Sequence, residues 1–170
     1  MKRLYAVLFV AIVGMSVAAI GFSAIAGGDD EDEFKANLRG LQEVPAISTT
    51  GRGRFVAELS EDGTSLSYTL TYSGLEANAL FAHIHLGQKG VNGGVSAFLC
   101  GGGNKPACPL RAGTVTGTIT ASDVIGPTGQ GIAAGDFAEL VKAMRAGVTY
   151  ANVHSTTFPG GEIRGQIKED

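Results

Sequence analysis

Three histidines occur in this 170-residue chain, and all of them lie in segments with the residue pattern of a β-strand. His83 and His85 stand in Ala-His-Ile-His, whereas His154 ends the run Tyr-Ala-Asn-Val-His. A strand turns alternate side chains to the same face, so a second strand ending at His154 can complete a cluster of three imidazoles. Neutral imidazole is a ligand of copper and zinc, so the spacing predicts a site for one such ion. The alternative is surface histidines, or hydrogen-bonded anchors at a strand end.

Two further polar residues are expected near that cluster. Asn152 precedes His154 by two positions and shares its strand face, where its amide can hydrogen-bond behind the metal ligands; the alternative is a strand-edge residue facing water. Arg164 shares a face with Glu162, and the simplest expectation is a cross-strand ion pair worth about 0 to 1 kcal/mol if exposed. A functional Arg164 that attracts anions toward a bound cation is the second interpretation.

The N-terminus has the order of features of a secretory signal peptide. Met1-Lys2-Arg3 is followed by an apolar stretch from Leu4 to Phe22, and Ala24-Ile25-Ala26 precedes Gly27. A positive start, an apolar centre and a small-x-small site predict export with cleavage after Ala26. The apolar stretch is long for a cleaved signal, so its retention as a membrane anchor is the alternative.

Cleavage of residues 1–26 would leave an acidic linker at residues 27–33 and one domain at residues 34–168. The 144 residues after the cut suffice for a single hydrophobic core. Without Lys2 and Arg3 the 13 basic residues become 11, against 16 acidic residues, which gives a net charge of −5. The basic residues are scattered among acidic ones along the sequence, so no nucleic-acid partner is expected.

The two cysteines, Cys100 and Cys108, bracket the flexible segment Gly-Gly-Gly-Asn-Lys-Pro-Ala. An even pair this close in an exported protein predicts a disulfide that closes a short loop and contributes about 2 to 3 kcal/mol. The rival interpretation makes the two thiolates additional metal ligands. Their separation fits neither a zinc hairpin nor a redox Cys-x-x-Cys, so the structural disulfide is favoured.

Short segments rich in Val, Ile, Thr, Tyr and Phe alternate with Gly, Pro, Asn and Asp after the linker. This pattern predicts an all-β fold, an antiparallel Greek-key sandwich or barrel of about eight strands. The clearest pair is a hairpin that joins Phe55–Leu59 to Leu66–Tyr72 through a turn at Gly63. The expected strands are residues 34–41, 53–60, 65–75, 80–86, 95–100, 114–120, 148–154 and 162–167.

One segment breaks the strand pattern and predicts a short helix near residues 136–146. Asp136 is a candidate N-cap and Gly147 a C-terminal stop. We expect this helix to cross one end of the sandwich with its apolar side chains in the core. Those side chains recur at helical spacing and are Phe137, Leu140, Val141 and Met144.

Four motifs follow one another along the chain: Ala36–Gly40 before Glu43-Val44-Pro45, Ala82–Gly87 before Gly90, Ala146–His154, and Gly161–Ile167. Taken in this order they resemble the CHRD domain, a module named for its repeats in chordin and also found singly in exported microbial proteins. The resemblance covers about residues 34–167 and implies a secreted β-sandwich domain without a settled activity. Growth-factor binding by chordin is assigned to other, cysteine-rich modules, which this chain lacks, so the resemblance implies no signalling role.

A weaker likeness is to Cu/Zn superoxide dismutase, whose Greek-key barrel carries a His-x-His pair on one strand and a further histidine on a late strand. His83, His85 and His154 resemble those elements, and Arg164 follows His154 by ten residues. That enzyme family uses additional histidines and an aspartate to hold a bridged second metal. This sequence has no fourth histidine, so a dinuclear site of that kind is not expected.

Three functional hypotheses follow. The first is a noncatalytic binding module, secreted or periplasmic, whose histidine face holds copper or zinc or docks an extracytoplasmic protein. The second is a mononuclear copper enzyme that acts on superoxide or a related oxidant, and the third is a structural surface domain without a ligand. No residues are assigned as catalytic, and a membrane is a partner only if the N-terminal segment is retained.

Overall fold

Residues 32–170, which the computed structural model describes, contain nine strands and one α-helix. All the strand pairs are antiparallel, so the predicted all-β antiparallel fold is confirmed. The strands are β1 (Glu33–Arg39), β2 (Arg52–Leu59), β3 (Ser65–Ser73), β4 (Ala79–Leu86), β5 (Gly94–Cys100), β6 (Gly113–Thr120), β7 (Thr149–Ser155), β8 (Ile163–Gln166) and β9 (Lys168–Glu169).

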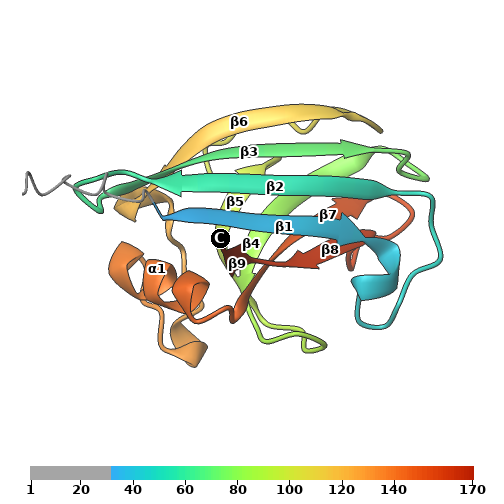
Figure 1. Cartoon of the computed structure of the whole chain (residues 1–170). Coiled ribbons are helices and arrows are strands. Elements are labelled where there is room, and N and C mark those ends of the chain that lie inside the picture. The colour runs from blue at the N-terminus through green and yellow to red at the C-terminus, as the bar shows by residue number, and fades with distance from the viewer. Residues whose placement is uncertain (1–31) are drawn as a thin grey trace, which may run out of the picture.

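The sheet curls into a nearly closed barrel with two layers (Figure 1). Its strand order is β5-β4-β7-β8-β1-β2-β3-β6, with β9 beside β1. One layer contains β1, β2, β3 and β6, and the other contains β4, β5, β7 and β8. The Greek-key connections bring β7 beside β4, so the segment with two histidines and the segment with the third lie next to each other.

The core fills the space between the two layers because alternate side chains of each strand point inward. On β3, for example, Leu66, Tyr68, Leu70 and Tyr72 are buried, whereas the residues between them face outward and are exposed. The predicted hairpin between β2 and β3 is confirmed, with Gly63 in the turn at a φ of 67°. The apolar pattern therefore fixes which face of each strand is buried.

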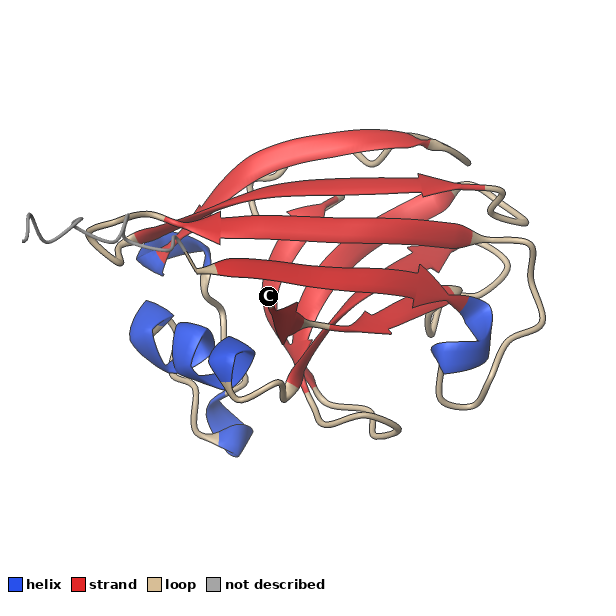
Figure 2. Ribbon diagram, viewed as in Figure 1, coloured by secondary structure: helices blue, strands red, loops and turns tan. Residues whose placement is uncertain are grey.

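The predicted helix is α1 (Phe137–Arg145). The Asp136 side chain accepts a hydrogen bond from the Glu139 amide at 3.3 Å, and Gly147 follows the helix with a φ of 66°. Figure 2 shows α1 and two of the three short 3-10 helices at one end of the barrel, away from the outer faces of the strands. The apolar face of α1 packs into the core through Phe137, Leu140, Val141 and Met144, as predicted.

The observed strand ends differ from the predicted ones by at most two residues, and the short β9 was not predicted. The first strand ends early because a 3-10 turn at residues 40–42 follows it, where the Gly40 carbonyl accepts bonds from Glu43 N at 3.0 Å and Ile47 N at 2.9 Å. A Cβ at Gly40 would lie 2.4 Å from the Ile47 carbonyl oxygen, so this turn requires glycine. The strand also begins one residue inside the predicted acidic linker, at Glu33.

The predicted signal segment, residues 1–26, and most of the predicted linker lie outside the described residues. Within residues 32–170 no helix has the length and apolar character needed to cross a membrane.

Cys100 and Cys108 are joined to each other, with their Cα atoms 5.1 Å apart. The predicted pairing is therefore present, and neither sulfur is a metal ligand. The loop that the disulfide closes packs against Phe98, because Gly102 and Gly103 lie so close to this ring that an added Cβ would come within 2.9 Å of it.

Candidate metal centre

The three histidines lie on the outer face of the layer that contains β4 and β7. Inward-pointing residues of the same two strands, such as Ala82 and Val153, belong to the core, so the alternate residues His83, His85 and His154 point away from it. A side chain on an outer sheet face is ordinarily exposed, yet these histidines are only 5%, 7% and 7% exposed. Loops must therefore cover this part of the barrel.

Three loops supply that cover. The 87–93 loop joins β4 to β5, the 40–47 segment follows β1, and the 156–162 loop joins β7 to β8. Asn92 Nδ2 donates to the Val44 carbonyl at 2.9 Å, which connects the first two loops. The 87–93 loop and the connection after β7 also contact the rings directly, through the carbonyls of Gly93 and Pro159.

The imidazole nitrogens converge. His83, His85 and His154 each offer one nitrogen, and these atoms all lie within 4.8 Å of one another. The closest pair, His83 Nδ1 and His154 Nε2, is separated by 3.2 Å. Two ligands of a tetrahedral ion with bonds of about 2.0 to 2.1 Å lie about 3.3 Å apart, so this pair already has the spacing of metal ligands.

Backbone carbonyls fix the protonation of two of the rings. His85 Nδ1 lies 3.0 Å from the Gly93 carbonyl oxygen, and His154 Nδ1 lies 2.9 Å from that of Pro159. A carbonyl oxygen only accepts, so each Nδ1 carries the proton and each Nε2 carries a lone pair. His154 Nε2 can then accept a proton only from His83 Nδ1, which makes the latter the donor of the 3.2 Å bond.

His85 Nε2 is left without a partner. It is buried and makes no hydrogen bond within the described part of the chain. A buried acceptor without a hydrogen-bond partner costs free energy. Such an atom in a native protein indicates that an ion, a water molecule or another group binds there. The Gly93 carbonyl holds Nδ1, so Nε2 is the nitrogen that His85 can offer to a metal, and the residues present fit a transition-metal ion.

Aromatic rings surround the cluster. Phe98 packs edge-on against His83 with ring centres 4.4 Å apart, and Phe81 lies 4.7 Å from the ring of His154. The Tyr150 ring stacks on His85 at 4.6 Å with an angle of 3° between the two planes. These rings hold the imidazoles in place and exclude water from their edges.

Burial keeps all three histidines neutral at physiological pH. It lowers the pKa of His83 to about 3, with smaller contributions from the neighbouring His154 and His85. Burial also lowers the pKa of His85 to about 4, against an opposing effect of its bond to Gly93, and it lowers the pKa of His154. Neutral imidazole is the form that binds a metal, so the site needs no deprotonation at pH 7.

Asn152 pairs in register with His83 on the neighbouring strand but makes its hydrogen bond elsewhere. Its Nδ2 donates to Glu43 Oε1 at 2.6 Å, while its Oδ1 is buried without a partner. Burial raises the pKa of Glu43 to about 7, although Arg164 and the bond from Asn152 oppose that shift. Sequence reasoning missed Glu43; its only signal was a place in the Glu-Val-Pro motif.

Arg164 is 2% exposed and does not form the expected ion pair with Glu162. Its guanidinium donates to Asn92 Oδ1 at 3.0 Å and to the carbonyls of Val91 and Gln88, so it holds the 87–93 loop. The Arg164 side chain also lines a hollow of about 340 Å³ together with Glu43, Lys89 and Gly90.

Glu162 is also buried and holds a different segment of the chain. Its Oε1 accepts from Thr49 Oγ1 and from the Glu76 amide, both at 2.7 Å. Glu162 and Arg164 therefore form their hydrogen bonds with different segments of the chain, although strand alternation predicts that they share a face. Each side chain is directed to the loop nearest to it, which strand alternation alone does not specify.

The family comparison agrees with the sequence motifs. The sequence model described as CHRD domain matches residues 34–167, which is nearly all of the described chain. Comparison with curated proteins and with solved structures gave no match.

Proposed function

The chain belongs to the CHRD domain family, and from that premise we propose that it is an exported, noncatalytic binding module that holds one copper or zinc ion through His83, His85 and His154. The observation that carries this proposal is the convergence of three imidazole nitrogens, one of which is a buried acceptor without a partner. A purely structural cluster would gain nothing from leaving that acceptor unsatisfied.

The donor set indicates which ions suit the site. All three ligands are neutral nitrogens, which copper(II) and zinc accept, and the Irving–Williams order favours copper(II) at equal concentration. His85 and His154 would bind through Nε2 with their Nδ1 protons kept on Gly93 and Pro159. His83 would bind through Nδ1, and its proton would move to Nε2, so no net proton release is required.

A bound ion would retain an open coordination position, which a water molecule can fill. The surroundings favour holding over turnover. The 87–93 loop covers the site, and the guanidinium of Arg164 is already occupied by that loop. A reactive site would need a free path for its substrate.

Export is supported by two independent features. The disulfide between Cys100 and Cys108 suits an oxidising compartment, and the order of residues 1–26 is that of a signal peptide.

Calorimetric titration of the full chain with copper(II) and with zinc tests the proposal. We expect one equivalent of metal to bind. Loss of a residue that only hydrogen-bonds to a metal ligand typically weakens metal affinity about 10- to 100-fold, and we expect His83→Ala to weaken it more than that. Lys142→Ala, an exposed change on α1, is the matched control and should bind as the wild type does. Equal metal content in wild type and His83→Ala would refute the site.

The enzymatic alternative needs its own measurement. The copper-loaded chain should accelerate superoxide loss no more than an equal concentration of chelated copper does, if the module is noncatalytic. A faster, saturable loss that His83→Ala abolishes would establish the copper enzyme instead.

A further inference from the structure

Three arginines gather on the outer face of β1 and β2, which β8 separates from the histidine strands β4 and β7 in the sheet order. Arg39 of β1 pairs directly with Arg52 of β2, and Arg54 lies two positions further along β2 beside Asn37. All three arginine side chains are exposed. Arg39 is distant in the sequence from Arg52 and Arg54, and the pairing of β1 with β2 creates this arginine patch (Arg39, Arg52 and Arg54).

Within residues 32–170 the arginine patch has no carboxylate within 4.0 Å. Arg54 contributes to lowering the pKa of Asp170, but the main partner of Asp170 is Lys35. Like charges directly opposite each other on neighbouring strands destabilise the pair, so the arrangement lowers stability in a chain that otherwise has an acidic balance. A bound anion would reverse that effect.

Hydroxyl groups lie directly beside the arginine patch. In register, Ser73 of β3 pairs with Arg52, and Thr71 pairs with Arg54. A shallow hollow of about 270 Å³ lies among these side chains. Charged donors and neutral donors therefore line the same depression, with Asn37 at its side.

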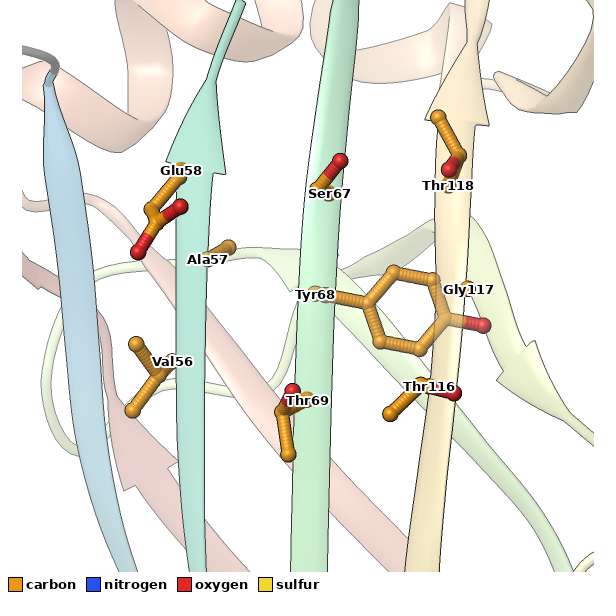
Figure 3. A pocket seen from close by; sticks show the side chains of 9 residues that line it. All are labelled: Val56, Ala57, Glu58, Ser67, Tyr68, Thr69, Thr116, Gly117 and Thr118. Atoms are coloured by element: carbon orange, nitrogen blue, oxygen red, sulfur yellow. The ribbon is translucent and has the colours of Figure 1, made fainter.

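The row of hydroxyls continues along β3 onto β6, the strand at that edge of the sheet. Figure 3 shows Ser67, Thr69, Thr116 and Thr118 beside a second hollow, of about 420 Å³. These four exposed residues form the hydroxyl face, in which neighbours are about 6.8 Å apart along a strand and about 4.8 Å apart between strands. Glu58 lies at its far end, so anionic groups are favoured only at the arginine end.

We propose that this surface binds a linear acidic polysaccharide. Carboxylate or sulfate groups would pair with the arginine patch, where the planar guanidinium forms two parallel hydrogen bonds to an oxyanion. Sugar hydroxyls would hydrogen-bond to the hydroxyl face. The proposal does not use the metal ligands, although Arg39 pairs in register with Arg164 of β8, so the arginine patch borders the surroundings of the metal centre.

The composition of the surface selects this ligand over other polyanions. The aromatic residues that line the two hollows, Tyr68 and Tyr72, are 3% and 1% exposed, so no ring is available to stack on nucleic-acid bases. Val56 is the one half-buried aliphatic side chain among the lining residues, which leaves no apolar surface to enter a lipid bilayer.

Binding of the full chain to dextran sulfate, measured by calorimetry at two salt concentrations, is the first test, with uncharged dextran as the neutral probe. We expect saturable binding to dextran sulfate and none to dextran. Arg52→Gln and Arg54→Gln should each weaken binding about tenfold, the value of one lost charge-assisted pair. Arg145→Gln removes an equal charge from an arginine that pairs with Asp32 and should change binding less than twofold.

Thr69→Val and Thr116→Val distinguish a polysaccharide from a simple oxyanion. They should weaken dextran sulfate binding about threefold through lost hydrogen bonds and leave the binding of inorganic tripolyphosphate unchanged. The proposal is overturned if Arg145→Gln weakens binding as much as Arg52→Gln, or if dextran sulfate does not bind. It is also overturned if a thymidine oligonucleotide or phosphatidylglycerol vesicles bind more tightly than dextran sulfate through the same arginines.

Discussion

The guanidinium carbon of Arg164 lies 3.4 Å from the centre of the Tyr150 ring, and the same ring stacks on His85. The stack joins an arginine that holds the 87–93 loop to an imidazole of the candidate metal centre. The same loop returns to His85 through the Gly93 carbonyl, and Gly93 N donates to the Tyr150 hydroxyl at 3.2 Å. The orientation of His85 therefore depends on Arg164 by two routes.

Replacing Arg164 should reduce metal affinity although it is not a ligand. Arg164→Gln removes the bonds to the 87–93 loop and the cation over Tyr150, so we expect about a 10- to 100-fold loss of copper or zinc affinity. Arg164→Lys should not restore it, because an ammonium group lacks the planar fork that reaches Asn92 and Val91 together. Calorimetry on folded variants gives the measurement, and wild-type affinity in Arg164→Lys would contradict this account.

Acid should destabilise the chain through its histidines. Their pKa values are lowered in the folded state from an ordinary value near 6.5, so above pH 6.5 both states are neutral and the effect is absent. Below pH 6.5 the unfolded chain binds protons that the folded chain does not, and the free energy of unfolding falls by about 1.4 kcal/mol per pH unit for each such histidine. The fall should level off near pH 3 to 4, where His83 and His85 protonate in the fold.

Urea unfolding of the metal-free chain from pH 7 to pH 4 measures this slope. His83→Gln removes one titrating group and should flatten the curve, whatever its effect on stability at pH 7. A wild-type stability that stays constant between pH 6.5 and pH 4.5 would show that the histidines are not buried as described.

Glu43 should have the opposite pH dependence. Its folded pKa of about 7 exceeds its ordinary value of 4.5, so the folded chain retains a proton that the unfolded chain loses, and stability declines as pH rises from 4.5 to 7. Glu43→Gln keeps an acceptor for Asn152 but has no carboxyl group to titrate, so it removes this decline. The free energy of unfolding of the variant, relative to that of the wild type, should therefore increase by about 3 kcal/mol between pH 4.5 and pH 8. Urea unfolding at both pH values tests it, with Glu61→Gln, a change at an exposed turn residue, as the control.

The sequence predicted much of the fold because its information is local. The alternation of apolar and polar residues predicted which face of β3 is buried. The Asp136 cap and Gly147 predicted where α1 begins and ends. Alternation also placed His83 and His85 on one face. What alternation does not provide is which strands are neighbours, and only the pairing of β4 with β7 brings His154 to the other two.

The cover of the candidate site could not be predicted. The contacts of Glu43 and Arg164 reach residues 109 and about 70 positions away, in loops whose paths no periodic pattern describes. The sequence gives no sign that outward-facing side chains on β7 are buried, because the loops that bury them follow other strands. For the same reason Arg164 was expected to pair with Glu162, two residues away, and its actual partners lie in the 87–93 loop.

Gly117 should be the least replaceable residue of β6. It pairs in register with Tyr68, whose ring lies over it and whose hydroxyl donates to the Leu99 carbonyl at 2.7 Å, connecting the two layers near the open edge of the barrel. A Cβ at Gly117 would lie 2.5 Å from that hydroxyl oxygen, so Gly117→Ala should destabilise the fold by about 1 to 3 kcal/mol. Gly160→Ala, where an added Cβ meets no atom within 4 Å, is the control and should cost little.

Because the clash is with the tyrosine, Gly117→Ala should destabilise less in a Tyr68→Leu background. Equal destabilisation in both backgrounds, measured by urea unfolding, would mean that the glycine is required for backbone reasons instead.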